Sequence, residues 1–331
     1  MTSIALFGNK GGIGKTTLTY HLAHMMQRLG RRVLAVDLDP QADLTVAFLD
    51  DDQLEVIWGE AESRSDITIA AAVQPIMDGI DDIEAVDPVQ ILDGLWLLPG
   101  DLGLSSFEDR LSEAWPRGFD GSDRAASRTT TAFYRIIRRA TEQTAADIVL
   151  IDMGSNLGAI NRAAVLAADS LLMPLAPDLL SLRGLRNLGP TLNGWRVTWQ
   201  TQMLPDAPND ISAPSGSMIP LGYVIMQPAM RLDRPVLAYR RWLDRIPGVF
   251  HSAVLGEEEF DPSDESYEIA TVRNYQSLRL LSHDARKPMF DLRAADGALG
   301  STQTYVQKCY QDFRDVAQEL LARLDDVIPP L

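Results

Sequence analysis

The stretch that decides the fold is ALFGNKGGIGKTT, residues Ala5–Thr17. It places a glycine-rich loop between a short apolar run, Ser3–Gly8, and a helical pattern that begins at Lys15. Apolar side chains recur at helical spacing after the loop, and Gly30 closes the predicted helix. Residues 31–39, RRVLAVDLD, form a second apolar run. Strand, loop, helix and strand predict a βαβ unit, and therefore a parallel sheet covered by helices.

The same alternation continues along the chain. Helical patterns separate further apolar runs, which we expect to be buried strands, at residues 94–100, 146–154, 169–176 and 219–227. We expect one α/β domain over residues 1–331, doubly wound, with a mostly parallel central sheet flanked by helices. Residues 200–218 and 256–267 are rich in turn-forming and acidic residues and are expected to be surface loops. The expected surface insertions lie around residues 51–93, 200–218 and 256–268.

Composition restricts the class of protein. The chain of 331 residues contains one cysteine, Cys309, so a disulfide framework, a zinc ribbon or a metal cluster held by cysteines is excluded. No apolar run approaches the roughly 20 residues that span a bilayer, and the N-terminus does not resemble a signal peptide. We therefore expect a cytoplasmic protein with no membrane partner.

The formal charge of −16 is unevenly distributed. Residues 51–130 contain 18 acidic and 5 basic residues, and residues 251–269 contain 7 acidic and no basic residues. Because the acidity is confined to these two segments, the rest of the surface can still form a basic patch.

The glycine loop has the composition of a phosphate-binding loop. It lies between the end of a strand and the start of a helix, where backbone N–H groups and the helix dipole favour anions. Glycines allow the backbone to approach a phosphate, Lys15 would reach the β- and γ-phosphates, and the Thr16 hydroxyl would bind Mg²⁺. The residues expected to bind the nucleotide phosphates are Lys10, Gly11, Gly12, Gly14, Lys15, Thr16 and Thr17.

A second lysine in the loop needs its own explanation. The chain has only four lysines, and two of them, Lys10 and Lys15, lie in this loop. The strict P-loop pattern would place its first glycine at Asn9, whereas residues 10–16 read KGGIGKT. This is the deviant Walker A pattern, and the sequence here resembles the ParA/MinD family of P-loop ATPases, which have the SIMIBI-type fold. The resemblance implies binding of ATP or ADP with Mg²⁺ and an ATP-dependent homodimer. It also implies that Lys10 stabilises charge on the phosphates of the partner subunit's nucleotide.

Two further motifs extend the resemblance. VLAVDLDPQADLT, residues 33–45, places Asp39 where the family has the acid that orients the attacking water and helps to hold Mg²⁺. IVLIDMGSNLG, residues 148–158, ends an apolar run in Asp152, as a Walker B strand does. The resemblance thus implies that Lys10, Lys15 and Asp39 are catalytic and that Thr16, Asp39 and Asp152 hold the metal. The family often has two prolines just after this acid, whereas Gly154 and Ser155 stand here.

No sequence motif identifies the adenine-binding residues. The end of the predicted strand 219–227, near Gln227 and Pro228, is the topological place for the base, although these residues could equally pack a loop.

The motifs leave the cargo of the ATPase open. The first interpretation is a ParA-type partition or positioning ATPase that binds DNA without sequence preference and is stimulated by a separate partner protein. Such a protein would be associated with the nucleoid. Its support is a set of arginines that could neutralise phosphates, although the arginines around residue 240 could equally be one solvated helix face. The expected DNA-binding residues are Arg231, Arg234, Arg240, Arg241, Arg245, Arg273 and Arg279.

The alternative is an ATP-dependent switch that regulates a protein partner without DNA, with residues 51–130 as the docking surface. A MinD-like membrane ATPase is rejected, because the tail ELLARLDDVIPPL is acidic and ends in prolines. An electron-donating reductase would need several cysteines, and a small-molecule ligase would not explain Lys10.

Overall fold

The computed structural model describes residues 2–59, 67–226, 230–231, 234–235, 237–257, 260–261 and 266–327. Eight strands form one central sheet in the order β10-β7-β6-β1-β5-β2-β4-β3, and every neighbouring pair is parallel except β3 with β4. The strands of this sheet are β1 Thr2–Leu6, β2 Val33–Asp37, β3 Val89–Leu92, β4 Leu95–Leu98, β5 Ile148–Asp152, β6 Ser170–Leu175, β7 Ile219–Met226 and β10 Glu268–Val272. A separate hairpin pairs β8 Met230–Arg231 with β9 Arg234–Pro235.

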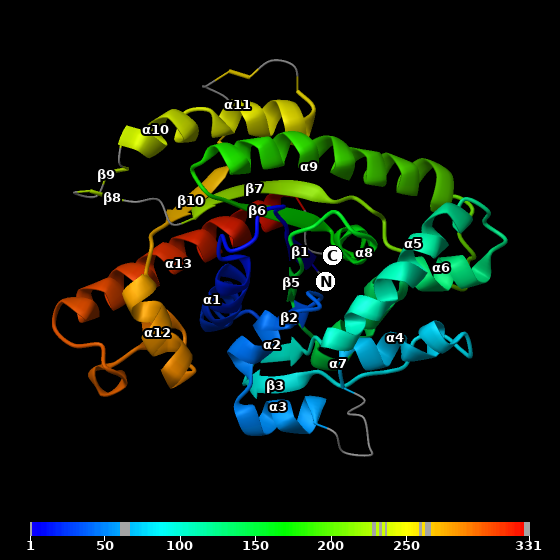
Figure 1. Ribbon diagram of the computed structural model, residues 1–331, viewed down its shortest axis with the longest axis horizontal. Coiled ribbons are helices and arrows are strands. Elements are labelled where there is room, and N and C mark those ends of the chain that lie inside the picture. The colour runs from blue at the N-terminus through cyan, green and yellow to red at the C-terminus, as the bar shows by residue number, and fades with distance from the viewer. Residues whose placement is uncertain are drawn as a thin grey trace.

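Helices cover both faces of the sheet (Figure 1). They are α1 Lys15–Arg28, α2 Asp43–Phe48, α3 Asp51–Trp58, α4 Ile69–Asp78, α5 Phe107–Arg117, α6 Arg124–Thr130, α7 Ala132–Thr144, α8 Ala159–Ala167, α9 Leu179–Thr198, α10 Leu237–Leu243, α11 Ile246–Phe250, α12 Gln276–Ala285 and α13 Ser301–Val327. Short 3₁₀ turns lie at Leu102–Ser106, Met289–Asp291 and Ala294–Asp296, and π-helical turns lie at Trp199–Met203 and His251–Leu255.

The two faces bury alternate residues of each central strand. Ala5 on β1 belongs to the core that contains α4, α5, α7, α8 and α9, whereas Ile4 and Leu6 belong to the core that contains α1 and α13. All five residues of β2 and of β5 are buried, as expected for strands with helices on both sides. These two cores produce the three-layered arrangement, and the predicted doubly wound α/β fold with a mostly parallel sheet is confirmed.

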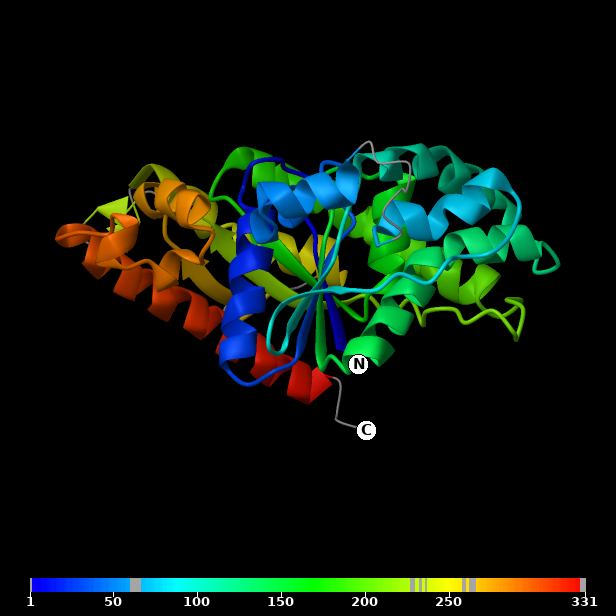
Figure 2. The same cartoon turned by 90° about the horizontal axis from the view of Figure 1, so that it is seen from below.

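The carboxyl ends of the parallel strands form the edge that matters for function. In Figure 2 the start of β1 and the end of α13 lie low in the view, whereas the loop after β1 lies at the opposite end of the strands. Leu6 at the end of β1 pairs with Asp152 at the end of β5, and Asp152 pairs with Asp37 at the end of β2. Ligands of open α/β sheets bind outside such an edge.

The expected surface loop at residues 200–218 needs a correction. Trp199–Met203 form a π-helical turn that continues α9, and the Trp199 and Met203 side chains are buried. The Trp199 indole N–H donates to the carbonyl of Pro214 at 2.9 Å. Because the segment supplies apolar side chains to the core, it is partly a packed element. The expected insertion at 51–93 contains α3, α4 and β3, and part of the insertion at 256–268 lies outside the described residues.

Candidate nucleotide-binding site

The glycine loop has a conformation that leaves the start of α1 open to a ligand. Gly12 and Gly14 have positive φ angles of 73° and 98°, which glycine adopts without steric cost. Gly14 is the N-cap of α1, and no side chain caps this helix. The N–H groups of the first turn therefore lack a side-chain acceptor, and the dipole of a 14-residue helix adds positive potential there.

A cavity of about 280 Å³ lies in front of this loop. Lys15 lines it and is buried at 8% exposure, while Asp39 and Gly154 line it from the ends of β2 and β5. A Cβ atom at Gly154 would lie 3.3 Å from Asn161 Nδ2 and 3.8 Å from Asp39 Oδ1, so Gly154 lies directly beside this carboxylate. The cavity is lined by Lys10, Gly11, Gly12, Ile13, Gly14, Lys15, Thr16, Thr17, Asp39, Gln41, Asp43, Gly154, Ser155, Asn156 and Arg279. The whole predicted phosphate loop thus faces one cavity together with Asp39.

Asp152 is tied to the first turns of α1. Its carboxylate accepts hydrogen bonds from the hydroxyl groups of Thr16, at 2.6 Å, and Thr19, at 3.2 Å. Burial raises the pKa of Asp152 to about 6, while Lys15 and these hydroxyl groups oppose the shift. Asp152 therefore lies directly behind the Thr16 hydroxyl, which suits an acid that acts on a metal ion through its neighbours.

Asp37 is a second buried acid beside this one. Burial and, to a smaller extent, the charge of Asp152 raise its pKa to about 8, against the opposing hydrogen bonds from Thr45 and from the N–H of Asp39. Its Oδ2 accepts from the backbone N–H and the hydroxyl of Thr45 at 2.8 and 2.7 Å, and the Thr45 hydroxyl oxygen accepts from Gly100 N–H at 2.8 Å. Asp37 thus fixes the segment after Asp39 against the end of β4.

Lys10 is held by an acid on another element. Its ammonium group forms an ion pair with Asp178, the N-cap of α9, and the two side chains are 29% and 34% exposed. Burial acts to raise the pKa of Asp178, but hydrogen bonds from Lys10 and from Ser181 N–H keep it below its ordinary value. Asn9, at the position where the strict pattern has a glycine, donates to the carbonyl of Gly184 on the same helix at 3.4 Å. The loop is therefore docked on α9 through both residues.

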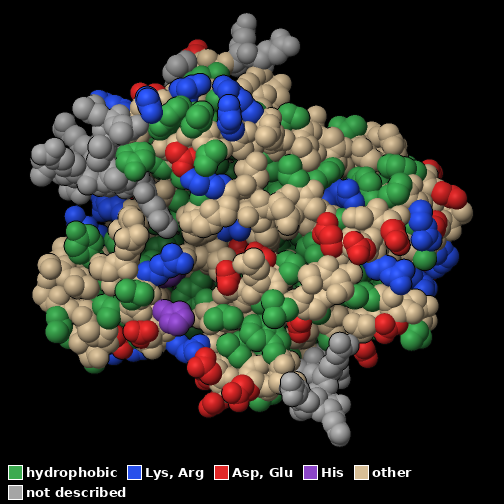
Figure 3. Space-filling view, in the orientation of Figure 1, with side chains coloured by type: hydrophobic (Ala, Val, Ile, Leu, Met, Phe, Trp, Pro, Cys, Tyr) green, Lys and Arg blue, Asp and Glu red, His purple; other side chains and the backbone are tan. Residues whose placement is uncertain are grey.

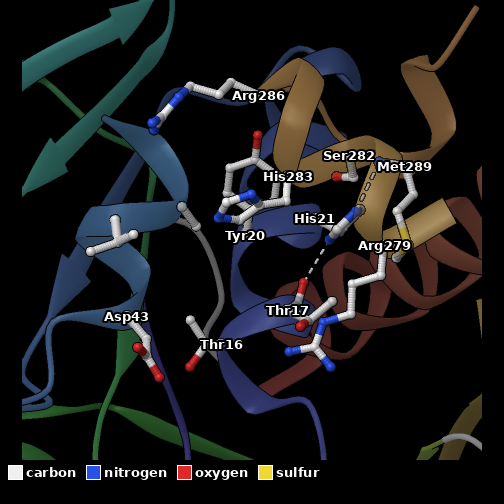
Figure 4. Close-up of a pocket in the computed structure, with 12 residues that line it drawn as sticks. Thr16, Thr17, Tyr20, His21, Asp43, Arg279, Ser282, His283, Arg286 and Met289 are labelled. Atoms are coloured by element: carbon white, nitrogen blue, oxygen red, sulfur yellow. Dashed lines mark hydrogen bonds between the residues drawn. The ribbon is translucent and has the colours of Figure 1, made fainter. Parts of the chain in front are cut away.

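A second cavity of about 280 Å³ continues from the first between α1, α2 and α12 (Figure 4). His21 lies on its wall with its Nδ1 2.7 Å from the Thr17 carbonyl and its Nε2 accepting from Met289 N–H at 3.0 Å. Burial lowers the pKa of His21 to about 4, so this side chain is neutral and ties α1 to the segment after α12. The two cavities share Thr16, Thr17, Asp43 and Arg279.

The arginines expected to bind DNA fall into separate groups. Arg240, Arg241 and Arg245 are exposed on or just after α10, and Figure 3 shows basic side chains over α10 and α11. Arg273 lies 3.7 Å from Asp312 in an ion pair, and Arg279 lines the phosphate cavity. The side chains of Arg231 and Arg234 are not described, and Gln227 and Pro228 lie outside the described residues. The described arginines of this set therefore lie in different places and do not form one surface patch.

Sequence reasoning missed Asp178 and the place of Arg279. Asp178 follows β6, which pairs with β1, so the rule that parallel strands end at one edge could have placed it beside the loop. Arg279 lies 264 positions after Lys15, and no local pattern connects the two residues.

Comparisons with known proteins agree with this geometry. The profile of the AAA-domain family matches residues 1–203. The chromosome-partitioning ATPase Soj of Thermus thermophilus is 31% identical over 194 residues, which cover 59% of this chain and 62% of Soj. The chain spans between 40% and 62% of the length of the curated relatives that it matches.

Solved structures show the same fold over nearly the whole chain. The protein DIP2308 of Corynebacterium diphtheriae has a TM-score of 0.72 at 23% identity, covering 98% of this chain and 99% of that one. An ATP complex of a McdA variant from Cyanothece has a TM-score of 0.63 at 15% identity, covering 97% and 96%.

No helix among the described residues is both long and apolar enough to cross a membrane. With the glycine loop, the two lysines and the matching family profile, the chain belongs to the AAA-domain family and is a member of the ParA/MinD group of deviant Walker A P-loop ATPases.

Proposed function

We propose that the chain is a ParA-like ATPase that works as an ATP-dependent dimer switch in DNA partition or cargo positioning. Its ATP-bound homodimer binds duplex DNA without sequence preference in the cytoplasm, at the nucleoid, and a separate partner protein stimulates its slow hydrolysis. In this proposal residues 1–331 form one ATPase domain, and segments 51–93, 200–218 and 256–268 are insertions in it, of which 200–218 packs partly against the core.

The observation that carries the proposal is the arrangement of the two lysines. Lys15 is buried at the start of α1, whereas Lys10 lines the same cavity with a side chain that is 29% exposed. One ion pair, to Asp178, holds Lys10 in the free protomer. A partly exposed pair of this kind contributes about 0.2–1 kcal/mol, so Lys10 can leave it for a phosphate of the partner subunit's nucleotide.

The residues of the cavity fit Mg²⁺ and a nucleotide. Lys15 and the uncapped N–H groups of α1 would hold the phosphates, and the Thr16 hydroxyl and the Asp39 carboxylate would hold the metal ion. When bound, Mg²⁺ would neutralise negative charge on the phosphate oxygens. Asp152 positions the Thr16 hydroxyl through the 2.6 Å hydrogen bond. Asp39 would orient the attacking water.

The DNA-binding part of the proposal depends on Arg240, Arg241 and Arg245. These side chains are exposed, and two of them lie over the Trp242 ring, with the Arg241 and Arg245 guanidinium carbons 4.4 and 5.6 Å from its centre. Among the described side chains no carboxylate forms an ion pair with any of the three. Guanidinium groups that pair with no described carboxylate can neutralise DNA phosphates.

The experiment is a gel shift on random duplex DNA at low salt. We expect a shift with ATP and Mg²⁺ and none with ADP, because two basic surfaces must act together. The double variant Arg240→Glu with Arg241→Glu should lose the shift while it keeps ATP binding and dimerisation. The double variant Arg138→Glu with Arg139→Glu is the matched control, because it makes the same change of charge at two exposed residues on α7, which Figure 1 shows far from α10.

The alternative function is an ATP-dependent switch that acts on a protein partner without DNA. The excess of negative charge in residues 51–130, which contain 18 acidic and 5 basic residues, favours this alternative, because such a surface could bind a basic partner protein. If the wild-type protein gives no shift on any duplex with ATP at low salt, this alternative replaces the DNA-binding function.

A further inference from the structure

Arg279 lies at the junction of the two cavities. It comes from α12, and its side chain lines both the phosphate cavity and the second cavity. Figure 4 shows its guanidinium group extending past Thr17 toward the start of α1. The side chain is exposed, and within the described ranges no hydrogen bond or ion pair holds it. This places an uncommitted cation beside the first turn of α1.

The neighbouring basic residues are committed to protein partners. Arg286 donates to the carbonyl of Leu49 and to the Asp51 carboxylate, at 2.7 Å for the latter. Lys287 donates to Asp296 at 2.8 Å. These contacts fix the end of α12 and the segment after it against the rest of the molecule. Arg279 therefore extends from a helix that other cations anchor, with its own charge free for a ligand.

The electrostatics around Arg279 favour an anion. Its guanidinium group faces the uncapped start of α1, where the helix dipole is positive and Lys15 contributes another charge. Like charges repel, so an anion between Arg279 and Lys15 would stabilise this arrangement beyond what Asp39 and Asp43, which line the same cavity, contribute. Asp152 is already engaged by Thr16 and Thr19, and Asp43 is the only carboxylate shared by both cavities among the described residues.

We propose that Arg279 binds the phosphates of the nucleotide held by its own protomer, and is not a DNA-binding residue. This inference rests on the proposed ATPase function and deepens it. The second cavity, which Arg279 also lines, contains Thr16 and Thr17 but no residue from Lys10 to Lys15. Since Lys15 reaches the β- and γ-phosphates, Arg279 is at the opposite, α-phosphate end.

The planar guanidinium group suits this role. It can donate two parallel hydrogen bonds to a phosphate, whereas an ammonium group donates as a single point charge. Loss of charged hydrogen bonds should weaken binding about 10- to 100-fold. Because ATP and ADP both carry an α-phosphate, the loss should be similar for the two nucleotides.

The test is calorimetry of the full chain with Mg-ATP, Mg-ADP and adenosine. Arg279→Ala should weaken binding of ATP and ADP by similar factors of at least about tenfold and leave adenosine unchanged, and Arg279→Lys should recover part of the loss. Arg138→Ala is the control, since it removes the same charge from an exposed position on α7 that lines neither cavity, and it should bind nucleotide as the wild type does. In a gel shift at saturating ATP, Arg279→Ala should still bind DNA.

Three results would overturn the assignment. Unchanged nucleotide affinity in Arg279→Ala would remove its role in binding. A loss restricted to ATP would place the side chain at the γ-phosphate and contradict the α-phosphate position. Normal nucleotide affinity with lost DNA binding would return Arg279 to the DNA surface. A wild-type protein that binds no nucleotide would instead refute the proposed function itself, and this inference with it.

Discussion

Lys10 has two competing partners if the proposed dimer forms, and Asp178 controls the competition. In the free protomer the ammonium group pairs with Asp178. In the dimer it would leave this acid for the partner subunit's nucleotide. Replacing Asp178 by Asn removes the charge that competes for Lys10. The substitution preserves the N-cap of α9, because Asn caps helices as well as Asp does and its side-chain oxygen can accept the hydrogen bond from Ser181 N–H that Asp178 accepts at 2.9 Å. We therefore expect Asp178→Asn to strengthen ATP-dependent dimerisation.

The magnitude follows from the exposure of the pair. The two side chains are 29% and 34% exposed, so each pair contributes about 0.2–1 kcal/mol after screening by solvent. A symmetric dimer releases two pairs, or about 0.4–2 kcal/mol, which is a dimer roughly 2- to 30-fold tighter. Sedimentation equilibrium with Mg-ATP measures this dissociation constant.

Two controls separate this mechanism from a general charge effect. Asp291→Asn breaks the Arg28–Asp291 pair, which has similar exposure of 40% and 29% but no contact with the cavity, and should leave the dissociation constant unchanged. In a Lys10→Ala background, whatever ATP-dependent dimerisation remains should not change with Asp178→Asn, because the two residues act through each other. A dimer that Asp178→Asn weakens, or does not change, would refute the reasoning.

Four other results are expected. Lys15→Ala should bind nucleotide much more weakly when measured by calorimetry, because the phosphate charge is then uncompensated. Unchanged affinity would show that this loop does not bind the phosphates. Lys10→Ala should bind ATP yet lose dimerisation or hydrolysis, and a variant that dimerises and hydrolyses ATP as the wild type does would contradict the role across the interface. Asp39→Ala should accumulate the ATP-bound dimer in sedimentation, because the attacking water is no longer oriented. A phosphate-release assay should show slow turnover of the protein alone, and rapid turnover without a partner would indicate a metabolic enzyme instead. Because the folded-state pKa of Asp37 is raised from 3.8 to about 8, its contribution to the free energy of unfolding should fall as pH rises between these values, by at most about 1.4 kcal/mol per pH unit. Urea midpoints at pH 5 and 8 should therefore differ less in Asp37→Asn than in the wild type, and equal differences would contradict the buried protonated state.

The sequence was most informative where a pattern is local. Strands β2, β5 and β6 are continuous apolar runs because helices cover both of their faces, and the glycine loop follows from its own residues. The role across a dimer interface that is expected of Lys10 is implied by the resemblance alone, and its ion-pair partner Asp178 lies 168 positions away at the start of another helix. The sequence predicts a DNA-binding role for Arg279 because it follows other arginines along the chain, and no local pattern places it beside the phosphate loop. Its place in the same two cavities as Thr16 and Thr17 depends on how α12 packs after β10, which composition does not encode.

The arginines of one protomer are too few for strong DNA binding, which explains how DNA binding could depend on the ATP-bound dimer. Each protomer of the proposed switch contributes three exposed arginines around α10, so Arg240, Arg241 and Arg245 can neutralise about three phosphates. At about −0.9 per phosphate, the slope of log affinity against log salt is about −2.7 for a protomer and about −5.4 for a dimer with both surfaces on one duplex. A protein with a formal charge of −16 gains little affinity for DNA from the three phosphate contacts of a single protomer, because its acidic segments repel DNA. Doubling the contacts on one rigid body makes the second surface bind intramolecularly. ATP would then control DNA binding through Lys10 and the dimer alone, with no change in the arginines themselves.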